Sequence, residues 1–381
     1  MTAGDFLRRM PDADFRRPTN LWRRLHIDPT LLMLLMLLTG FGLVVLYSAS
    51  GTDTHYVKRQ MVFFGLGYVG MFIVAQVNLQ FLERWAWWFY IGGVVLLVCV
   101  LFFGVGAKGA QRWLSLGGFR FQPSEIMKVA TPIMIAAYLC RRAIPPRFKH
   151  IVVTLVLVFV PTILIMRQPD LGTSLLIAMS GLIVLFLAGL GWRYIFGALG
   201  IVLASAWPMW RFGLHEYQRT RILTLLDPEA DKLGSGWNII QSKTAIGSGG
   251  VHGKGWLNGT QSQLDFLPES HTDFIIAVLA EEFGLVGVLA LIGLYVLILG
   301  RGLLIAVSSQ QTFSRLLAGS ITFTLFVFIF VNIGMVAGLL PVVGVPLPFV
   351  SHGGTSLLTL MVGFGLLMAV STERKRINLN L

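Results

Sequence analysis

The stretch LLMLLMLLTGFGLVVL (Leu31–Leu46) contains no charged residue, and it sets the character of the whole chain. A helix needs about 20 mostly apolar residues to cross the hydrocarbon core of a bilayer. This stretch lies in one such apolar span, residues 28–49. Further spans follow at residues 57–77, 82–104, 123–140, 150–166, 171–191, 194–212, 273–300, 313–339 and 355–371. The pattern predicts an all-α polytopic membrane protein with about ten transmembrane helices.

The composition of the 381 residues agrees with a membrane protein. The chain is 55% hydrophobic and 13% charged, with a mean hydropathy of +0.75, whereas a soluble domain carries about 25% charged residues. Transmembrane β-strands of about ten alternating residues are much shorter than these spans, which excludes a β-barrel. The net charge of +12 is interpreted as a topology signal and not as a sign of a nucleic-acid partner.

The distribution of Lys and Arg predicts the orientation. With ten crossings both termini lie on one side, and that side holds 17 basic residues in the termini and short loops, against 7 on the other. The positive-inside rule then places both termini in the cytoplasm. The expected organisation is a cytoplasmic arm (1–27), one transmembrane domain (28–371) with a large extracytoplasmic loop (213–272), and a cytoplasmic tail (372–381).

The unusual sequence features fall on the predicted outer side. They are the segments 105–122, 167–170, 213–272 and 340–354, and internal carboxylates gather in or beside them. Charge near a bilayer is costly unless it is paired, solvated or used. We therefore expect the functional site on the outer face.

The first candidate cluster spans Ala107–Lys128, where a polar and aromatic loop leads into a helix. Glu125 and Lys128 are three residues apart, so they share one face of that helix. This pair is either a structural ion pair or the charged wall of a cavity. The other candidate cavity residues here are Lys108, Arg112, Trp113, Gln122 and, in a separate Gln-Pro-Asp turn, Asp170.

The long loop supplies further candidate substrate-binding residues. Arg219, Arg221 and Lys243 lie in it, and arginine suits bidentate recognition of phosphate. For the two arginines, anchoring to lipid headgroups is an equally good interpretation. The glycine-rich stretch Ile246–Gly259 is not a nucleotide-binding loop, because the spacing of its glycines and lysine does not fit that motif.

The segment LPESHTDFIIAVLAEE (Leu267–Glu282) places carboxylates at the mouth of an apolar span. We expect a helix that begins at Pro268 and Glu269, with Thr272 and Asp273 in its first turns. A carboxylate there can act as general base, proton relay, cation ligand or helix cap. Glu269 is a candidate cap or supporting acid, and Glu281 and Glu282 have no sequence-based explanation.

The segment LLPVVGVPLPFVSHGG (Leu339–Gly354) breaks the helical pattern with three prolines and three glycines. Irregular backbone at membrane depth is tolerated when it is buried in protein or lines a cavity, so Ser351 is a further candidate cavity residue. The sequence contains no Cys/His cluster of the kind that binds a metal tightly. A weakly held divalent cation, Mg²⁺ or Mn²⁺, between carboxylates and a substrate phosphate is compatible with the sequence.

Long motifs along the chain after about residue 25 resemble one known family. They include KGAQRWL, FQPSEIMK, QPDLGTS, YQRTRILTLLDPE, GWNIIQSKTAIGSGG, AEEFGLVG and VNIGMVAGLLPVVGVPLPFVS. These motifs are similar to those of the SEDS family (shape, elongation, division and sporulation proteins). The run GWLNGTQSQLDFLPE resembles the elongation branch of that family. One departure is His352, where the family usually has Tyr, and it puts in doubt any role for that side chain.

The resemblance implies a function. It implies a peptidoglycan glycosyltransferase that polymerises lipid II on the outer face during cell elongation, as part of the elongation machinery. It also implies a class B penicillin-binding protein, a transpeptidase, as partner. The family's essential aspartate falls on Asp273, and its cavity Glu and Lys fall on Glu125 and Lys128. Two alternatives remain open from the residues: a lipid flippase or transporter, and a scaffold that activates the transpeptidase.

Overall fold

The computed structural model describes residues 21–107, 110–116, 119–213, 216–231, 235–263, 266–267 and 269–373. Apart from three short strands, it is built of helices. In chain order these are α2 (Leu21–Arg24), α3 (Pro29–Ala49), α4 (Thr54–Ala75), α5 (Leu79–Phe103), α6 (Pro123–Leu139), α7 (Phe148–Met166), α8 (Leu171–Leu187), α9 (Trp192–Pro208), the π-helical turn η2 (Met209–Gly213), α10 (Glu216–Leu226), the 3₁₀ turn η3 (Pro228–Asp231), α11 (Ser235–Gly249), α12 (Thr260–Gln263), α13 (Ile275–Ser308), α14 (Thr312–Val336) and α15 (Thr355–Ser371).

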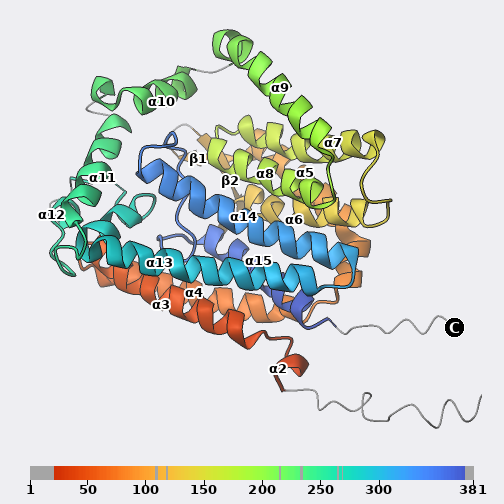
Figure 1. Cartoon of the computed structure of the whole chain (residues 1–381), viewed down its shortest axis with the longest axis horizontal. Coiled ribbons are helices and arrows are strands. Elements are labelled where there is room, and N and C mark those ends of the chain that lie inside the picture. The colour runs from red at the N-terminus through yellow and green to blue at the C-terminus, as the bar shows by residue number, and fades with distance from the viewer. Residues whose placement is uncertain are drawn as a thin grey trace, which may run out of the picture.

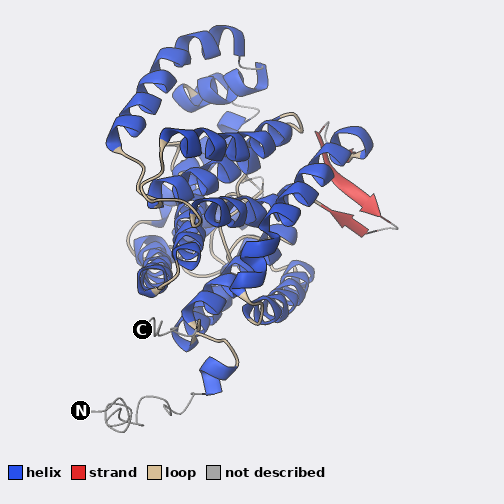
Figure 2. Cartoon of the chain, turned by 90° about the vertical axis from the view of Figure 1, so that its right-hand side faces the viewer, coloured by secondary structure: helices blue, strands red, loops and turns tan. Residues whose placement is uncertain are grey.

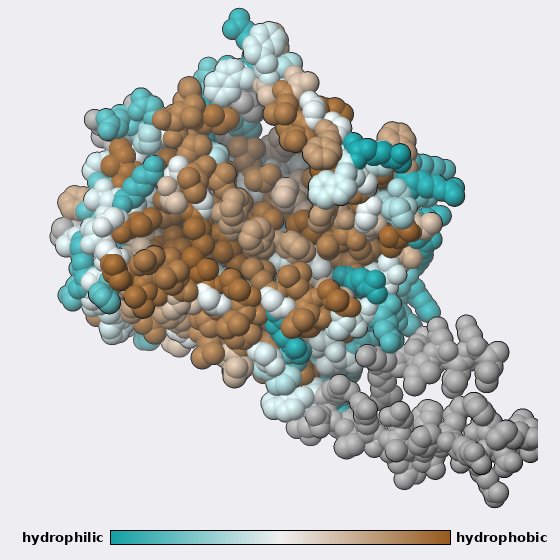
Figure 3. Space-filling view, viewed as in Figure 1, coloured by the Kyte–Doolittle hydropathy of each residue, from teal (hydrophilic) through white to brown (hydrophobic). Residues whose placement is uncertain are grey.

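Every apolar span predicted from the sequence contains a helix of this structure. Among the described residues, 8 helices are long and apolar enough to cross a membrane. The two remaining predicted spans are occupied by α6 and α8, which have 17 residues each. Figure 3 shows a broad band of apolar side chains over the bundle, with polar side chains toward its two ends. The chain is thus an all-α, multi-pass membrane protein.

Several helices begin at an Asp or Asn that caps the first turn. Asp28, Asp53, Asn78 and Asp170 each accept a hydrogen bond from a backbone N–H two or three residues further on. The first N–H groups of a helix have no partner inside it, and they need one where water is scarce. These caps explain why α3, α4, α5 and α8 begin where they do.

α14 occupies the middle of the bundle, where it packs against α13, α8, α6 and α15. α4 pairs with α15, α5 with α6, and α3 and α11 lie against α13. In Figure 1, α11 and α12 lie at one end of the bundle, and α2 and the last turn of α15 lie toward the other. We call these the loop end and the terminal end.

The segment 105–122, predicted as an irregular loop, contains a small antiparallel sheet instead. Its strands β1 (Val105–Ala107), β2 (Ala110–Leu116) and β3 (Phe119–Phe121) are ordered β1-β2-β3. Val105 pairs with Trp113 and Leu114 with Phe121. Figure 2 shows the strands at one edge of an otherwise helical molecule. The sheet satisfies the backbone groups of this segment and leads directly into α6.

Candidate active site

A cavity of about 270 Å³ lies at the loop end, between β2, the first turns of α6 and α8, and the broken segment that joins α14 to α15. Six of the predicted cavity residues line it: Arg112, Trp113, Gln122, Glu125, Lys128 and Asp170. The broken segment contributes Gly344, Val345 and Pro346 at one side and residues 353–356 at the other. The structure thus brings side chains from segments that are distant in the sequence to the wall of one cavity.

Glu125 and Lys128 form an ion pair in the wall of this cavity. The Lys128 Nζ lies 2.7 Å from the Glu125 Oε1, and both side chains are about nine-tenths buried. The ammonium also lies 5.4 Å from the centre of the Phe328 ring. The second carboxylate oxygen, Glu125 Oε2, is buried without a hydrogen-bond partner in the described part of the chain. A buried carboxylate oxygen without a donor can still accept a hydrogen bond from a ligand.

Asp170 serves both as a helix cap and as part of the cavity wall. Its Oδ1 accepts a hydrogen bond from Thr173 N at 3.3 Å, which caps α8. Its Oδ2 accepts one from Gln122 Nε2 at 3.0 Å and lies 4.0 Å from Arg112 Nε. Arg112 also donates to the carbonyl of Pro169. A guanidinium that is about a third exposed therefore faces the cavity from a fixed position.

The expected helix does not begin at Glu269, and Pro268 lies outside the described residues. Glu269 has a positive φ of 58°, and residues 269–274 form turns before α13 begins at Ile275. The backbone N–H groups of Thr272 and Phe274 both donate to the Glu269 carbonyl, at 3.1 and 3.3 Å. Asp273 therefore lies in a turn rather than in a helix, and this turn (residues 269–274) is called the Asp273 turn below.

The Asp273 carboxylate lies at the rim of the cavity. A Cβ placed on Gly344, which lines the cavity, would lie 3.5 Å from Asp273 Oδ2. Burial, together with the negative charge of Glu269, raises the pKa of Asp273 to about 6, and Arg221 opposes that rise. A pKa near the working pH suits a group that accepts and releases a proton.

The broken segment is tied to the Asp273 turn by several hydrogen bonds. Ser351 Oγ donates to the Thr272 carbonyl, and His352 N donates to the His271 carbonyl at 2.9 Å. Ser351 is buried and lines a separate, much smaller cavity, so its position is structural. His352 contributes a ring that stacks edge-on against Tyr56, with ring centres 5.3 Å apart.

Asn332 also holds this arrangement together, although the sequence reasoning did not select it. Its side chain is fully buried, and Nδ2 donates to the carbonyl of Asp273 at 2.9 Å and to that of Val345 at 2.7 Å. One amide thus joins the Asp273 turn to the cavity wall. The sequence does mark Asn332 as an isolated polar residue in the apolar run Leu325–Val336. A polar side chain inside a membrane helix is costly, so its presence indicates a structural or functional role.

Other predicted site residues lie outside the cavity. Arg219 donates to the Arg211 carbonyl at 3.0 Å, and Lys243 packs its ammonium against Gly338 at the end of α14. Thr272 Oγ1 donates to Glu269 Oε2 at 2.8 Å within the Asp273 turn. Lys108 lies outside the described residues.

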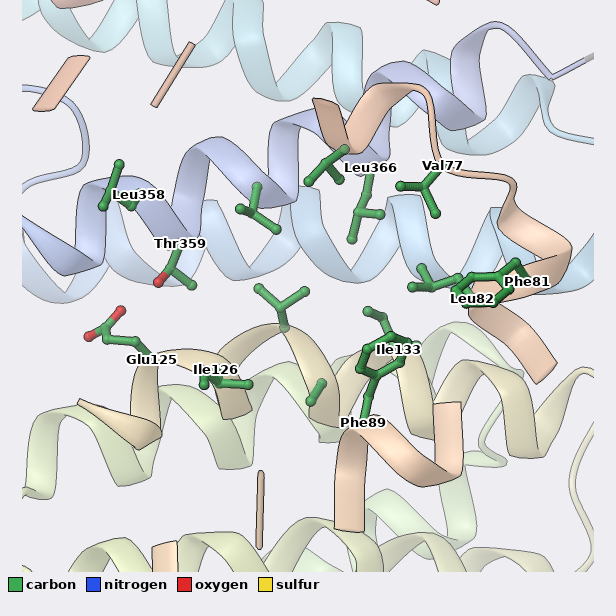
Figure 4. Close-up of a pocket in the computed structure, with 14 residues that line it drawn as sticks. Val77, Phe81, Leu82, Phe89, Glu125, Ile126, Ile133, Leu358, Thr359 and Leu366 are labelled. Carbon is green, nitrogen blue, oxygen red and sulfur yellow. The ribbon is translucent and has the colours of Figure 1, made fainter. Parts of the chain in front are cut away.

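A second, apolar groove of about 430 Å³ meets the cavity at Glu125, which lines both. Its walls come from α4, α5, α6 and α15 and are almost entirely aliphatic and aromatic. Figure 4 shows Glu125 and Thr359 at one end of the groove and Val77 and Phe81 at the other. A ligand with a polar head and a hydrocarbon tail fits such a pair of spaces.

Among the described residues, no group of three or more His, Cys, Asp and Glu side chains is arranged to hold a metal ion.

The chain matches the family FTSW_RODA_SPOVE, described as "Cell cycle protein", over residues 29–376. The chain belongs to this family. It is the family that the sequence motifs resemble. The match extends through all the helices from α3 to α15.

Individual relatives agree with this assignment. The chain is 54% identical over 357 residues to "Peptidoglycan glycosyltransferase MrdB" of Escherichia coli (strain K12), covering 94% of this chain and 96% of the relative. It is 38% identical over 370 residues to "Probable peptidoglycan glycosyltransferase FtsW" of Trichlorobacter lovleyi, covering 93% and 95%.

Solved structures are similar as well. A structure described as "Structural coordination of polymerization and crosslinking by a peptidoglycan synthase complex" matches with a TM-score of 0.80 and 32% identity, over 90% of this chain and 97% of that one. The "Rod shape determining protein RodA" of Thermus thermophilus matches with a TM-score of 0.69 and 29% identity, over 92% and 98%.

Proposed function

We propose that this chain is a peptidoglycan glycosyltransferase of cell elongation that polymerises lipid II on the outer face of the inner membrane. The activity follows from family membership and from a relative of that name at 54% identity. The substrate, the face of the membrane and the residue roles are proposals that rest on the site.

One observation carries the substrate proposal: a charged cavity and an apolar groove share Glu125. Lipid II has a sugar and pyrophosphate head on a polyprenyl tail. The cavity offers Arg112 and Lys128 to the phosphates, and the groove offers hydrocarbon walls to the tail. A soluble sugar nucleotide has no hydrocarbon tail, so it would not occupy the groove.

In the proposed mechanism Asp273 is the general base. Its carboxylate removes the proton from the acceptor sugar hydroxyl, and the hydroxyl oxygen attacks the anomeric carbon of the donor. The bond from that carbon to the pyrophosphate oxygen breaks, and undecaprenyl pyrophosphate leaves. Positive groups beside the cavity stabilise the charge that develops on the leaving group. Positioned proton transfer contributes roughly 10²–10⁴ in rate.

A divalent cation, Mg²⁺ or Mn²⁺, and a class B penicillin-binding protein complete the proposal. If such a cation binds, the Asp273 carboxylate would help to hold it weakly, and the cation would offset the negative charge of the substrate phosphates. The partner is proposed because a similar solved structure belongs to a "peptidoglycan synthase complex".

The test is polymerisation of purified lipid II by the full-length protein together with its transpeptidase. We expect Asp273→Asn to lower the rate by at least about a hundredfold, because the amide cannot accept the proton. The variant must stay folded and bind its partner for this result to count. A chelator arm, with Mg²⁺ or Mn²⁺ added back, tests the cation separately.

The same assay separates the alternatives. Transfer of lipid II between leaflets without glycan product would instead indicate a flippase. Normal cell-shape rescue by an Asp273→Ala protein that still binds the transpeptidase would indicate a scaffold. Glycan chains made by the wild type and not by Asp273→Asn would support the proposal that the chain is a glycosyltransferase.

A further inference from the structure

Glu281 is a buried carboxylate that the proposed mechanism does not use. Its side chain is fully buried two turns into α13. Glu281 Oε1 accepts hydrogen bonds from Lys254 Nζ at 2.7 Å, Thr260 N at 2.8 Å and Thr260 Oγ1 at 2.9 Å. Gln261 N lies 3.1 and 3.2 Å from the two carboxylate oxygens. So many donors converge on a group only when its position is strongly fixed.

Lys254 lies in the glycine-rich stretch Ile246–Gly259, which does not fit a nucleotide-binding loop, and Thr260 and Gln261 follow it directly. α13 has a break at Gly284, where φ is 64° and ψ is −161°. In a regular helix the Glu281 carbonyl would accept from Leu285 N. Here Leu285 N donates to the Gly250 carbonyl at 3.0 Å instead, and Lys254 N donates to the Glu281 carbonyl at 3.0 Å.

The backbones can approach this closely because glycines meet at the crossing. A Cβ on Gly249 would overlap the Ala280 carbonyl, and one on Gly253 would overlap the Glu282 carbonyl. Glu282 adds a second link, since Ser48 of α3 donates to its Oε1. Trp256 extends the contact to α3 through a 3.3 Å hydrogen bond to the Val44 carbonyl.

The topology gives this junction a consequence for the active site. The chain runs from Thr260 and Gln261 to the Asp273 turn and then down α13 to Glu281. Thr260 and Gln261 lie at the start of this loop, and Glu281 lies at its end. The hydrogen bonds between them therefore join the two ends of the loop. The Asp273 turn lies on a loop whose base is closed by the Glu281 side chain together with backbone hydrogen bonds such as Lys254 N to the Glu281 carbonyl and Leu285 N to the Gly250 carbonyl.

We propose that Glu281, through its hydrogen bonds to Lys254, Thr260 and Gln261, is a positioning residue that closes the base of the loop carrying Asp273 and so fixes Asp273 at the cavity rim. This inference rests on the proposed role of Asp273 as general base. Opening the junction leaves the turn attached through Asn332, Ser351 and Ser270, whose Oγ donates to the Ala49 carbonyl at 3.0 Å, but removes the side-chain link at the base of the loop. Displacement of a reacting group by about 1 Å costs roughly a hundredfold in rate.

The test compares Glu281→Gln with a matched control in the full-length protein purified with its transpeptidase. The control is Asp28→Asn, because Asp28 is also a buried carboxylate, paired to Arg301 at 2.6 Å at the terminal end. Each variant is measured for its melting temperature, its kcat and KM for lipid II, and the hydrogen exchange of amides 269–274.

We expect Glu281→Gln to lower kcat roughly tenfold to a hundredfold with a smaller change in KM, and to speed exchange in the Asp273 turn. Asp28→Asn should lower the melting temperature while leaving kcat and that exchange near wild type. Lys254→Met should give a smaller loss in the same direction, and the double variant should be no worse than Glu281→Gln alone.

A folded Glu281→Gln protein with normal kcat and normal exchange at 269–274 would overturn the proposal. An equal loss of kcat in Asp28→Asn would also overturn it, since the effect would then be general destabilisation. If Glu281→Gln does not fold, Lys254→Met and Thr260→Val decide by the same measurements. An active Asp273→Asn protein would refute the role of Asp273 as general base. Hydrogen exchange of amides 269–274 would still show whether Glu281 fixes the position of the Asp273 turn.

Discussion

At the scale of single residues, the Asp273 carboxylate combines partial burial with charged neighbours of both signs. Burial and Glu269 raise its pKa to about 6, and Arg221 opposes the rise. The base must be ionised, so kcat/KM should be high above this pKa and should fall as the pH drops through about 6. Glu269→Gln should move this acidic limb to lower pH, and Arg221→Gln should move it to higher pH.

The measurement is the pH profile of kcat/KM for lipid II polymerisation. Arg142→Gln, which removes a charge at the terminal end of the bundle, is the control and should leave the limb in place. Shifts of the same sign in the Glu269 and Arg221 variants would show that their charges do not act on the base.

Asn332 predicts a second effect at a single residue. Asn332→Leu removes the donor of both the Asp273 and the Val345 carbonyls, and each buried carbonyl left without a partner costs about 1–3 kcal/mol. We expect a loss of stability together with a lower kcat, measured by thermal unfolding and by polymerisation. Ser320→Ala is the control, because Ser320 is a buried donor in the same helix that bonds to the Ser180 carbonyl, away from the site. Equal kcat in the two variants would show that Asn332 does not contribute to the active site.

The residues that could be predicted from the sequence were those whose charge conflicts with a membrane. Glu125, Lys128, Arg112 and Asp170 stood out for this reason, and the cavity contains all of them. Asn332 and Glu281 act mainly on backbone groups of segments distant in sequence. Such contacts depend on the tertiary fold, so spacing along the chain does not reveal them.

At the scale of elements, the break in α13 has the clearest physical cause. Gly284 adopts a φ of 64° with an extended ψ, a conformation that costs other residues about 1–3 kcal/mol, and its Cβ would overlap the backbone of Gly253. We expect Gly284→Ala to lower the unfolding free energy by at least this amount. Gly293→Ala in the same helix meets no atom within 4 Å and should be neutral or slightly stabilising.

Thermal unfolding of the two variants in the same detergent checks this prediction. Similar melting temperatures would mean that the crossing at Gly284 tolerates a side chain. The sequence did not indicate the break, because a glycine in AEEFGLVG has the appearance of an ordinary packing glycine in a membrane helix. The turn at Glu269 was not evident from the sequence either, because the hydrogen bonds that tie residues 271 and 272 to the broken segment join parts of the chain about 80 residues apart.

At the scale of the whole molecule, hydropathy was sufficient to place the apolar helices, since crossing a bilayer requires about 20 apolar residues, but it did not predict α10, α11 and α12 in the long loop. Hydropathy does not say which helices touch. The cavity needs α6 beside α8 and the broken segment, and the groove needs α4 and α15 beside α5 and α6. Small residues allow some of these close contacts: a Cβ on Gly93 of α5 would overlap Met127 of α6, and one on Gly365 of α15 would overlap the Met71 carbonyl of α4.

The last prediction concerns orientation, which decides which compartment the cavity faces. Thr54→Cys lies at the loop end and Ala143→Cys at the terminal end, both at exposed positions, in a protein whose Cys99 and Cys140 are replaced by Ala. We expect a membrane-impermeant maleimide to label Thr54→Cys in intact spheroplasts and Ala143→Cys only after permeabilisation, because the basic loops stay in the cytoplasm. The reverse pattern would put the cavity in the cytoplasm. Glycan made there would be separated from the wall by the membrane, so the proposed polymerase would be on the wrong side for its product.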